Sequence, residues 1–234
     1  KGSFSQTRVE DLGRAVLEEA VRRTPGLNKA DVEDVILGCA MPEGEQGLNV
    51  ARIMSLYAGF PVTTPAITVN RFCASGLQAV AFAAERIMAG YADVIVAGGA
   101  ESMSHVPMSG FRFSPHPVLS VEYPEIYLGM GLTAEYVAER YGVSREDQDR
   151  YAAASHRKAA EAIRAGKFKE EIVPVHAVLR SVDDEGTVTS VKKVLDADEG
   201  VRADTSEEIL AKLKPVFKLN GTVTAGNTSQ MSDG

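Results

Sequence analysis

One cysteine stands where the sequence predicts that a strand ends and a helix begins. The β-branched run 65–70 predicts a buried strand, and the helix-forming run 77–89, closed by Gly90, predicts a helix. Cys73 would lie on the turn between them, in Asn70-Arg71-Phe72-Cys73-Ala74-Ser75-Gly76. This position exposes the sulfur, and the positive end of the helix dipole favours the thiolate. Because the thiolate is the nucleophilic form, the pattern indicates nucleophilic chemistry at Cys73.

The pattern alone leaves a second interpretation of Cys73 open. Most free cysteines are core thiols, and a strand–cysteine–helix turn also occurs without chemistry. Cys39, which ends the run 34–38 before Met41 and Pro42, fits a core thiol better. Two cysteines without CxxC or Cys/His spacing predict neither a disulfide framework nor a metal site, and they favour a reducing, cytoplasmic setting.

Other chemistry-bearing residues carry weaker signals. The four histidines are possible bases without a recognisable partner spacing: His105, His116, His156 and His176. Gly98 and Gly99 follow a predicted strand but match neither phosphate-loop pattern, so close packing under the Cys73 turn is the favoured interpretation. A basic set (Arg202, Lys212, Lys214 and Lys218) fits either a solvated face or an anion site.

The composition is that of an ordinary globular chain of one or two domains. Its 234 residues are 24% charged, with a net charge of −7. The negative balance argues against general nucleic-acid binding, which needs basic clusters, but it leaves room for a small anionic ligand. No apolar run reaches the roughly 18–20 residues that span a bilayer, so we expect no membrane span.

The chain before residue 104 alternates helical and apolar patterns. Helices are predicted over 8–23, 47–57 and 77–89, and strands over 34–38, 65–70 and 93–99. Strands connected in this way form a mostly parallel sheet that helices cover on both faces. The predicted fold class is therefore α/β.

The pattern after residue 104 is less regular. An irregular stretch (104–128) precedes helices from 131 and over 144–166, the second opened by a capping box at Ser144–Asp147. Further predictions are strands at 171–175 and 187–191, a helix capped by Thr205–Glu208 and ended by Pro215, and a strand with a tight loop in 221–229. We expect a half-domain (1–106), an inserted module (107–215) and a return to the first core (216–234).

Four segments, in order, resemble the thiolase family over nearly the whole chain. They are NRFCASGLQAV, ADVIVAGGAESMSHVPM, MGLTAEYVAERYGVSREDQDRYAAASHRKA and GTVTAGNTSQMSDG, the first matching the family's Asn-x-x-Cys-x-Ser-Gly pattern. The resemblance implies a layered α/β/α half-domain with an inserted, CoA-binding α+β loop domain. It also implies that the family's first strand precedes Lys1 and that its C-terminal half is absent from this chain.

The resemblance implies an acyltransferase of fatty-acid β-oxidation. Cys73 would attack the keto carbonyl of a 3-ketoacyl-CoA, release acetyl-CoA and hold the acyl group as a thioester until a second CoA collects it. The backbone N–H of Cys73 would donate to the oxyanion. Coenzyme A is then a co-substrate, with no permanently bound cofactor and no metal.

The same resemblance assigns the CoA contacts residue by residue. Ser229, with Ala225 beside it, would contact the pantetheine arm, Phe217 would pack near that arm or the adenine, and Arg202 would lie near the adenine and phosphates. Met130 would line the acyl pocket. Gly129 stands where short-chain biosynthetic thiolases often carry histidine, which favours the 3-ketoacyl-CoA type over an acetoacetyl-CoA-forming acetyl-CoA acetyltransferase.

Three family features are missing from these residues: the Asn-Glu-Ala-Phe segment, the Gly-His-Pro histidine and the second catalytic cysteine, which Cys39 does not replace. We therefore expect a fragment that is inactive alone, since Cys73 lacks its base. The chain starts at Lys1 without Met, so organelle targeting stays open beside a cytoplasmic location. The family implies a homodimer or homotetramer. A non-catalytic acyl-CoA-binding protein and an irreversible ketoacyl synthase are the other hypotheses.

Overall fold

A computed structural model describes residues 2–234, which form two compact units. The first unit comprises residues 2–113, Val173–Ala197 and Ser232–Gly234, and the second comprises Ser114–Ile172 and Asp198–Met231. The domain boundaries expected near residues 106 and 215 concern folding units of the complete protein and stay a prediction.

The first unit is built on a parallel sheet, as the sequence predicted. Its strands are β1 (Asp34–Gly38), β2 (Ala66–Val69) and β3 (Ile95–Gly99), in the order β2-β1-β3. The register pairs Val35 with Ala66 on one side and with Val96 on the other. The carboxyl ends of all three strands therefore meet at one edge, where the Cys73 turn begins.

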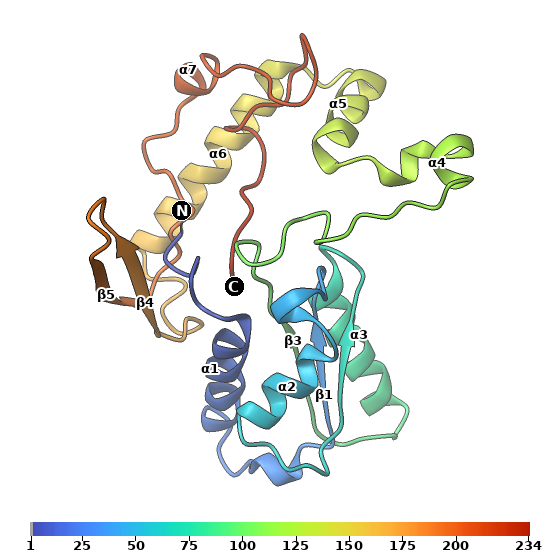
Figure 1. The fold of residues 1–234 in the computed structure, drawn as a ribbon, viewed down its shortest axis with the longest axis vertical. Coiled ribbons are helices and arrows are strands. Elements are labelled where there is room, and N and C mark those ends of the chain that lie inside the picture. Colours follow the sequence, from blue (N-terminus) through green and yellow to red (C-terminus); the bar gives the residue numbers. More distant parts are fainter. Residues whose placement is uncertain (1) are drawn as a thin grey trace. The chain divides into compact units, whose positions relative to one another are not determined.

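Three helices flank this sheet: α1 (Val9–Arg22), α2 (Val50–Tyr57) and α3 (Ser75–Met88). Val35 and Leu37 of β1 pack among residues of α1 and α2, whereas Ile36 packs against Ala79 and Ala83 of α3. Figure 1 shows α3 on the opposite side of β1 and β3 from α2. Because alternate strand residues face opposite sides, an unbroken apolar strand requires cover on both faces.

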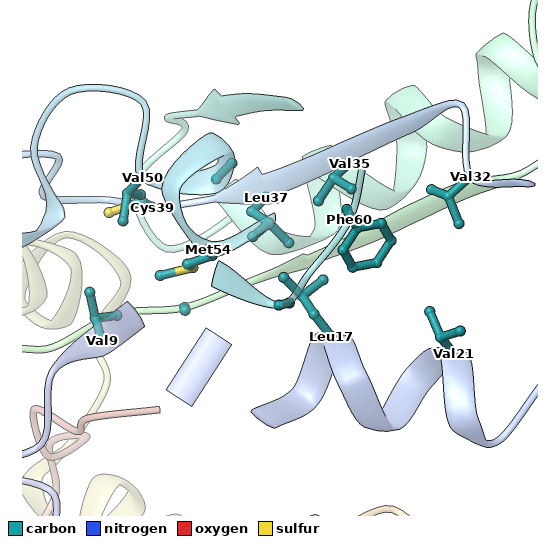
Figure 2. Packing of buried hydrophobic residues seen from close by; sticks show 13 residues of the cluster. Val9, Leu17, Val21, Val32, Val35, Leu37, Cys39, Val50, Met54 and Phe60 are labelled. Atoms are coloured by element: carbon teal, nitrogen blue, oxygen red, sulfur yellow. The ribbon is translucent and has the colours of Figure 1, made fainter. Parts of the chain in front are cut away.

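The core between α1, α2 and β1 holds the largest buried cluster of the first unit. Leu17 and Val21 of α1 lie across from Val35, Leu37 and Phe60 (Figure 2). Met54 of α2 is fully buried among them, with 0% of its surface exposed. A flexible thioether suits this position because it can fill an irregular gap beside the helix packing of α1.

Truncation of Met54 tests this packing. We expect Met54→Ala to lower the unfolding free energy by about 2–5 kcal/mol, because the lost contacts leave a cavity that close-packed neighbours fill only in part. The measurement is urea unfolding followed by circular dichroism. Val62→Ala is the control, since Val62 is 79% exposed and should change stability by no more than about 0.5 kcal/mol. Equal effects of the two substitutions would contradict this account of the core.

The first unit also contains an antiparallel hairpin, β4 (Val175–Val182) and β5 (Val188–Leu195). The strand expected at 171–175 is wrong: β4 begins where that prediction ended. Pro174 has no backbone N–H to donate to a ladder, so the strand starts directly after it. Gln6 fastens the hairpin, because its amide exchanges two 2.8 Å hydrogen bonds with the backbone of Arg180.

The second unit is mainly helical. Its long helices are α5 (Met130–Tyr141) and α6 (Arg145–Arg164), joined at Gly142, whose left-handed backbone ends α5. The cap predicted at 144–147 is confirmed, since Ser144 accepts a 3.1 Å hydrogen bond from the amide of Asp147. The irregular stretch holds only two short turns of helix, α4 (Leu119–Glu122) and η3 (Pro124–Tyr127). Two more such turns, η1 (Lys29–Asp31) and η2 (Gly44–Gln46), belong to the first unit.

Two expectations for the end of the chain are corrected. The helix after Thr205 is a single turn, α7 (Glu207–Leu210), capped by Ser206. The strand expected in 221–229 is wrong, because only one isolated bridge, Pro215 with Thr224, forms there. Side chains take the place of strand-to-strand hydrogen bonds in this loop. The amide of Thr224, for example, donates a 2.8 Å hydrogen bond to Oδ1 of Asn227. Within residues 2–234, the structure has no helix both long and apolar enough to cross a bilayer.

Candidate active site

Cys73 lies on the turn that connects β2 to α3, and its side chain is exposed. Cys39, by contrast, is buried, with 1% of its surface exposed. The core-thiol interpretation therefore applies to Cys39 and not to Cys73 in this chain. Phe72, directly before the thiol, has φ +44°, a backbone conformation that residues other than glycine rarely adopt. The left-handed residue makes the turn sharp, which sets Cys73 at the start of the helix.

Side chains of the sequence motif hold the turn in this shape. Oδ1 of Asn70 accepts a 2.9 Å hydrogen bond from the amide of Phe72. The Ser75 hydroxyl accepts a 2.8 Å hydrogen bond from the amide of Arg71 and donates one of 2.6 Å to the carbonyl of Phe72. Both polar side chains thus bind backbone groups of the sharp turn, and the Phe72 carbonyl accepts a further 3.0 Å hydrogen bond from the Ser75 amide. This role explains why Asn and Ser flank the cysteine.

The backbones of two glycines, Gly38 and Gly99, form the floor beneath the turn. A Cβ on Gly38, the last residue of β1, would lie 2.5 Å from the Gly76 amide nitrogen and 2.6 Å from the Ser75 carbonyl oxygen. A Cβ on Gly99 would lie 3.1 Å from the Gly38 oxygen and 3.4 Å from the Gly76 Cα. The interpretation of Gly98 and Gly99 as close packing under the Cys73 turn is therefore confirmed for Gly99 but not for Gly98, where an added Cβ would meet only a Leu37 methyl carbon at 3.9 Å.

Behind the turn lies a cluster that sequence reasoning missed, centred on the Glu101 carboxylate after β3. Its oxygens accept hydrogen bonds from the Ala40 amide (2.5 Å), the Met41 amide (3.3 Å) and the Gln46 side-chain amide (2.6 Å). The Cys39 thiol lies 3.6 Å from Oε1. Burial, and secondarily the charge of Glu101, raises the pKa of Cys39 to about 12, so this thiol stays protonated and unreactive at neutral pH.

The five residues expected to contact CoA all lie in the second unit and are exposed: Met130, Arg202, Phe217, Ala225 and Ser229. The Phe217 ring packs on the backbone of Gly131, beside Met130 at the start of α5. The backbone amide of Arg202 donates a 3.2 Å hydrogen bond to Nδ1 of His156, which is half-buried. The structure thus brings Phe217 to the start of α5 and places Ala225 and Ser229 in one loop.

A polar network fixes the loop that carries Ala225 and Ser229. The side-chain amide of Asn227 donates a 3.0 Å hydrogen bond to Asp149 of α6 and one of 3.1 Å to the Thr222 carbonyl. Asp149 also pairs with Arg145 at 2.8 Å, and Arg145 donates to the carbonyl oxygens of Leu210, which ends α7, and of Leu213. Side chains of α6 therefore take over the role that strand pairing was expected to play for this segment.

The Glu135 carboxylate of α5 anchors the start of the same loop. It is 4% exposed and accepts hydrogen bonds of 2.8–3.0 Å from the amides of Thr222 and Val223. Burial by itself would raise the pKa of Glu135, but these hydrogen bonds outweigh it and hold the pKa below its usual value. The ionised form therefore stabilises the loop.

We expect Glu135→Gln to reduce the unfolding free energy by about 1–3 kcal/mol at pH 7. The NH2 group of glutamine would replace one acceptor oxygen and would leave backbone amides of the loop without an acceptor. The contribution of an ionised carboxylate with a lowered pKa is complete above the ordinary glutamate value of about 4.3 and is lost as the pH falls through the folded value. The difference between the unaltered chain and the variant should accordingly shrink from pH 7 to about pH 3. Urea unfolding at both pH values measures it.

Glu139→Gln is the matched control one turn along α5. Glu139 pairs with Lys218 at 2.6 Å, but both side chains are well exposed, so the loss of this pair should lower the unfolding free energy far less than the loss of the Glu135 carboxylate. A Glu135→Gln effect that is no larger, or that does not change with pH, would show that the buried carboxylate does not anchor the loop.

The fold and the turn together define a class of protein: a parallel α/β chain that presents an exposed thiol at a helix N-terminus, with a second, mainly helical unit. The family described as "Thiolase, N-terminal domain" matches residues 1–234. The chain therefore belongs to the thiolase family.

Individual relatives agree with this assignment. The chain is 51% identical, over 234 residues, to a 3-ketoacyl-CoA thiolase of Bacillus subtilis (strain 168), covering 100% of this chain and 60% of the relative. It is 46% identical to the peroxisomal 3-ketoacyl-CoA thiolase 5 of Arabidopsis thaliana, over 100% of this chain and 51% of that protein. A crystal structure of the Bacillus anthracis acetyl-CoA acetyltransferase matches with a TM-score of 0.79 at 37% identity, covering 99% of this chain and 59% of that one. The chain thus spans between half and two thirds of the length of these relatives.

Proposed function

We propose that the complete protein carrying this chain is a degradative 3-ketoacyl-CoA thiolase, an acyltransferase of fatty-acid breakdown. The exposed Cys73 on its sharp, side-chain-locked turn is the observation that carries the proposal. An exposed thiol at a helix N-terminus has the access and the electrostatic surroundings that covalent catalysis needs. The relatives named 3-ketoacyl-CoA thiolase support the same substrate class.

The proposed reaction has two half-reactions. Cys73 Sγ attacks the 3-keto carbonyl, the Cα–Cβ bond breaks, and the released acetyl-CoA carbanion takes up a proton, which leaves an acyl thioester on Cys73. The thiol of a second CoA then attacks the thioester, loses its proton, and departs as the shortened acyl-CoA while Cys73 regains a thiol. The backbone N–H of Cys73, just before α3, is the donor proposed for the oxyanion. The acid–base groups for both proton transfers belong to the complete protein.

Coenzyme A binding is proposed for the second unit. Arg202 would meet the adenine and phosphates, Phe217 the pantetheine arm or the adenine, and Ala225 and Ser229 the pantetheine arm. Met130 would line the acyl pocket. The exposure of all five side chains and the side-chain network behind the 222–229 loop support these roles. The proposal includes the division into a core half-domain and a CoA-binding loop domain, and a homodimer or homotetramer in the cytoplasm. Peroxisomal relatives make an organelle the competing location.

A second candidate is an acetoacetyl-CoA-forming acetyl-CoA acetyltransferase, favoured by the name of the matching crystal structure. Both candidates use the Cys73 thioester and differ in substrate. Comparing kcat/KM for a medium-chain 3-ketoacyl-CoA and for acetoacetyl-CoA distinguishes them. A higher kcat/KM for the longer substrate supports the 3-ketoacyl-CoA type. Measurable turnover of acetoacetyl-CoA alone supports the alternative.

Selective alkylation tests the proposed nucleophile. Iodoacetamide at pH 8, followed by peptide mass spectrometry, should label Cys73 much faster than Cys39, because Cys39 is buried and its pKa is raised to about 12. CoA-dependent cleavage should decline in step with the labelling of Cys73, and incubation with substrate alone should protect Cys73 as a thioester. Full activity after complete labelling of Cys73 would overturn the proposal.

A further inference from the structure

We infer that Glu101 is a positioning residue for the Cys73 turn, acting through the two peptide groups that flank Ala40 and the side chain of Asn70. The inference rests on the proposed role of Cys73 as the nucleophile. It concerns a connection between the carboxyl ends of β1, β2 and β3, all within the first unit.

The first step of the connection joins β3 to the segment after β1. Oε2 of Glu101 accepts a 2.5 Å hydrogen bond from the Ala40 amide, while Oε1 accepts from the Met41 amide and the Gln46 side chain. Several donors converge on one carboxylate, and such charge-assisted hydrogen bonds are stronger than neutral ones. The two peptide groups that flank Ala40, one through the Ala40 amide and the other through the Met41 amide, are therefore held in one orientation.

The second step joins Ala40 to the turn. The carbonyl of Ala40 accepts a 3.1 Å hydrogen bond from Nδ2 of Asn70, whose Oδ1 accepts the amide of Phe72, the residue before the thiol. One planar amide thus binds Ala40 with one end and the turn with the other. Because the Phe72 backbone is in the left-handed region, a fixed partner for its amide helps hold the sharp turn that places Cys73.

Glu101 is itself held on both sides. Its backbone exchanges hydrogen bonds of 2.6 and 2.8 Å with Gly234. Gln46, which is fully buried, donates to the carboxylate and to the Met41 carbonyl at 2.8 Å, and accepts from the Ser102 amide. A carboxylate whose main chain and neighbours are fixed can transmit its own position to Ala40, which a freely rotating side chain could not.

Glu33 provides a matched control at the other end of the same strands. Its carboxylate, before β1, accepts hydrogen bonds of 2.5 and 3.2 Å from the amides of Asp93 and Val94, before β3. Glu33 and Glu101 therefore both link β1 to β3 through backbone amides, but only Glu101 lies at the edge that carries the Cys73 turn. Glu33→Gln reproduces the structural effect of losing such a link without touching the turn.

The experiment compares Glu101→Gln, Asn70→Asp, their combination and Glu33→Gln in the complete protein. In Glu101→Gln, an NH2 group replaces one carboxylate oxygen, so a hydrogen-bond donor faces the amide donors that this oxygen had accepted from. Asn70→Asp keeps the acceptor for Phe72 but sets an oxygen against the Ala40 carbonyl. The readouts are hydrogen exchange of the segment 70–75 and the rate constant for alkylation of Cys73 by iodoacetamide. Glu101→Asp, which keeps the charge but shortens the reach, replaces Glu101→Gln if that variant does not fold.

We expect Glu101→Gln to speed exchange in 70–75 and to slow Cys73 alkylation, each about tenfold, the size that loss of a hydrogen bond to a charged group gives. Glu33→Gln should change neither by more than about twofold. Since Glu101 acts through Asn70, the double variant should be no worse than the more affected single variant, whereas independent effects would multiply.

Two results would overturn the inference: exchange in 70–75 that is the same in Glu101→Gln and Glu33→Gln, or effects of the two single variants that multiply. Failure of the proposed function has a different signature. In that case Cys73 of the unaltered protein reacts no faster than Cys39, while the exchange comparison still decides whether Glu101 holds the turn.

Discussion

Replacing Cys73 with serine should reduce CoA-dependent cleavage of a 3-ketoacyl-CoA by the complete protein on the order of 10³-fold or more, the scale seen when a catalytic nucleophile is removed. A hydroxyl is a far weaker nucleophile than a thiolate, and no other exposed thiol stands in the described residues to replace it. The loss should appear in kcat, because Cys73 does not belong to the proposed CoA contacts. Steady-state kinetics with acetoacetyl-CoA and a longer 3-ketoacyl-CoA measure it.

The same substitution should leave the fold intact. The hydrogen bonds that hold the turn come from Asn70, Ser75 and backbone groups, and the Cys73 side chain is exposed. The thermal midpoint should therefore shift by no more than that of Val62→Ser, an exposed control in the same unit that should keep full activity. Retention of a tenth or more of the activity by Cys73→Ser would assign the chemistry to another group.

Substitution of Gly38 by alanine should have the largest effect on the fold. The new Cβ would lie 2.5 Å from the Gly76 nitrogen and 2.6 Å from the Ser75 oxygen, and these are backbone atoms that cannot rotate away. The start of α3 must then separate from β1, so we expect the unfolding free energy to fall by about 3 kcal/mol or more, the upper end for overpacked sites. Because the Cys73 turn leads directly into α3, the alkylation rate of Cys73 should fall as well.

Gly98→Ala is the control for this prediction. Gly98 occupies the neighbouring strand at the same edge, but the nearest atom to an added Cβ there is a Leu37 methyl carbon at 3.9 Å, an ordinary contact. The unfolding free energy of Gly98→Ala should differ from that of the unaltered chain by no more than about 0.5 kcal/mol. Urea unfolding and Cys73 alkylation measured on both variants give the comparison. Similar behaviour of Gly38→Ala and Gly98→Ala would contradict the close approach of β1 and α3.

Local sequence patterns predicted the helices and strands before residue 104 well, although they misplaced β4 of the same unit. The apolar runs around Val35, Ile67 and Val96 became parallel strands, and the amphipathic run after Arg8 became α1, because side-chain periodicity determines which face of an element can be buried. Predictions failed where a tertiary partner replaced a ladder. The 221–229 loop is β-branched in part, yet Asn227 and Glu135 satisfy its backbone.

The candidate site divides in the same way. Cys73 could be found because the strand, the turn and the helix adjoin in the sequence, and Asn70 and Ser75 lie within three residues of it. The roles of Met130, Arg202, Phe217, Ala225 and Ser229 came from the family resemblance and stay predictions. Glu101 carried no local signal, since its partners Ala40 and Gln46 lie 61 and 55 positions away.

The sequence by itself therefore determined the type of fold, the thiol and its place between a strand and a helix. These depend on short-range periodicity and on the dipole of one helix. Only the tertiary structure decided how the turn is supported, by the Gly38 backbone beneath it and by Glu101 behind it. Parallel strands bring their carboxyl ends together from distant parts of the chain, so the contacts that fix the nucleophile exist only once the sheet has formed.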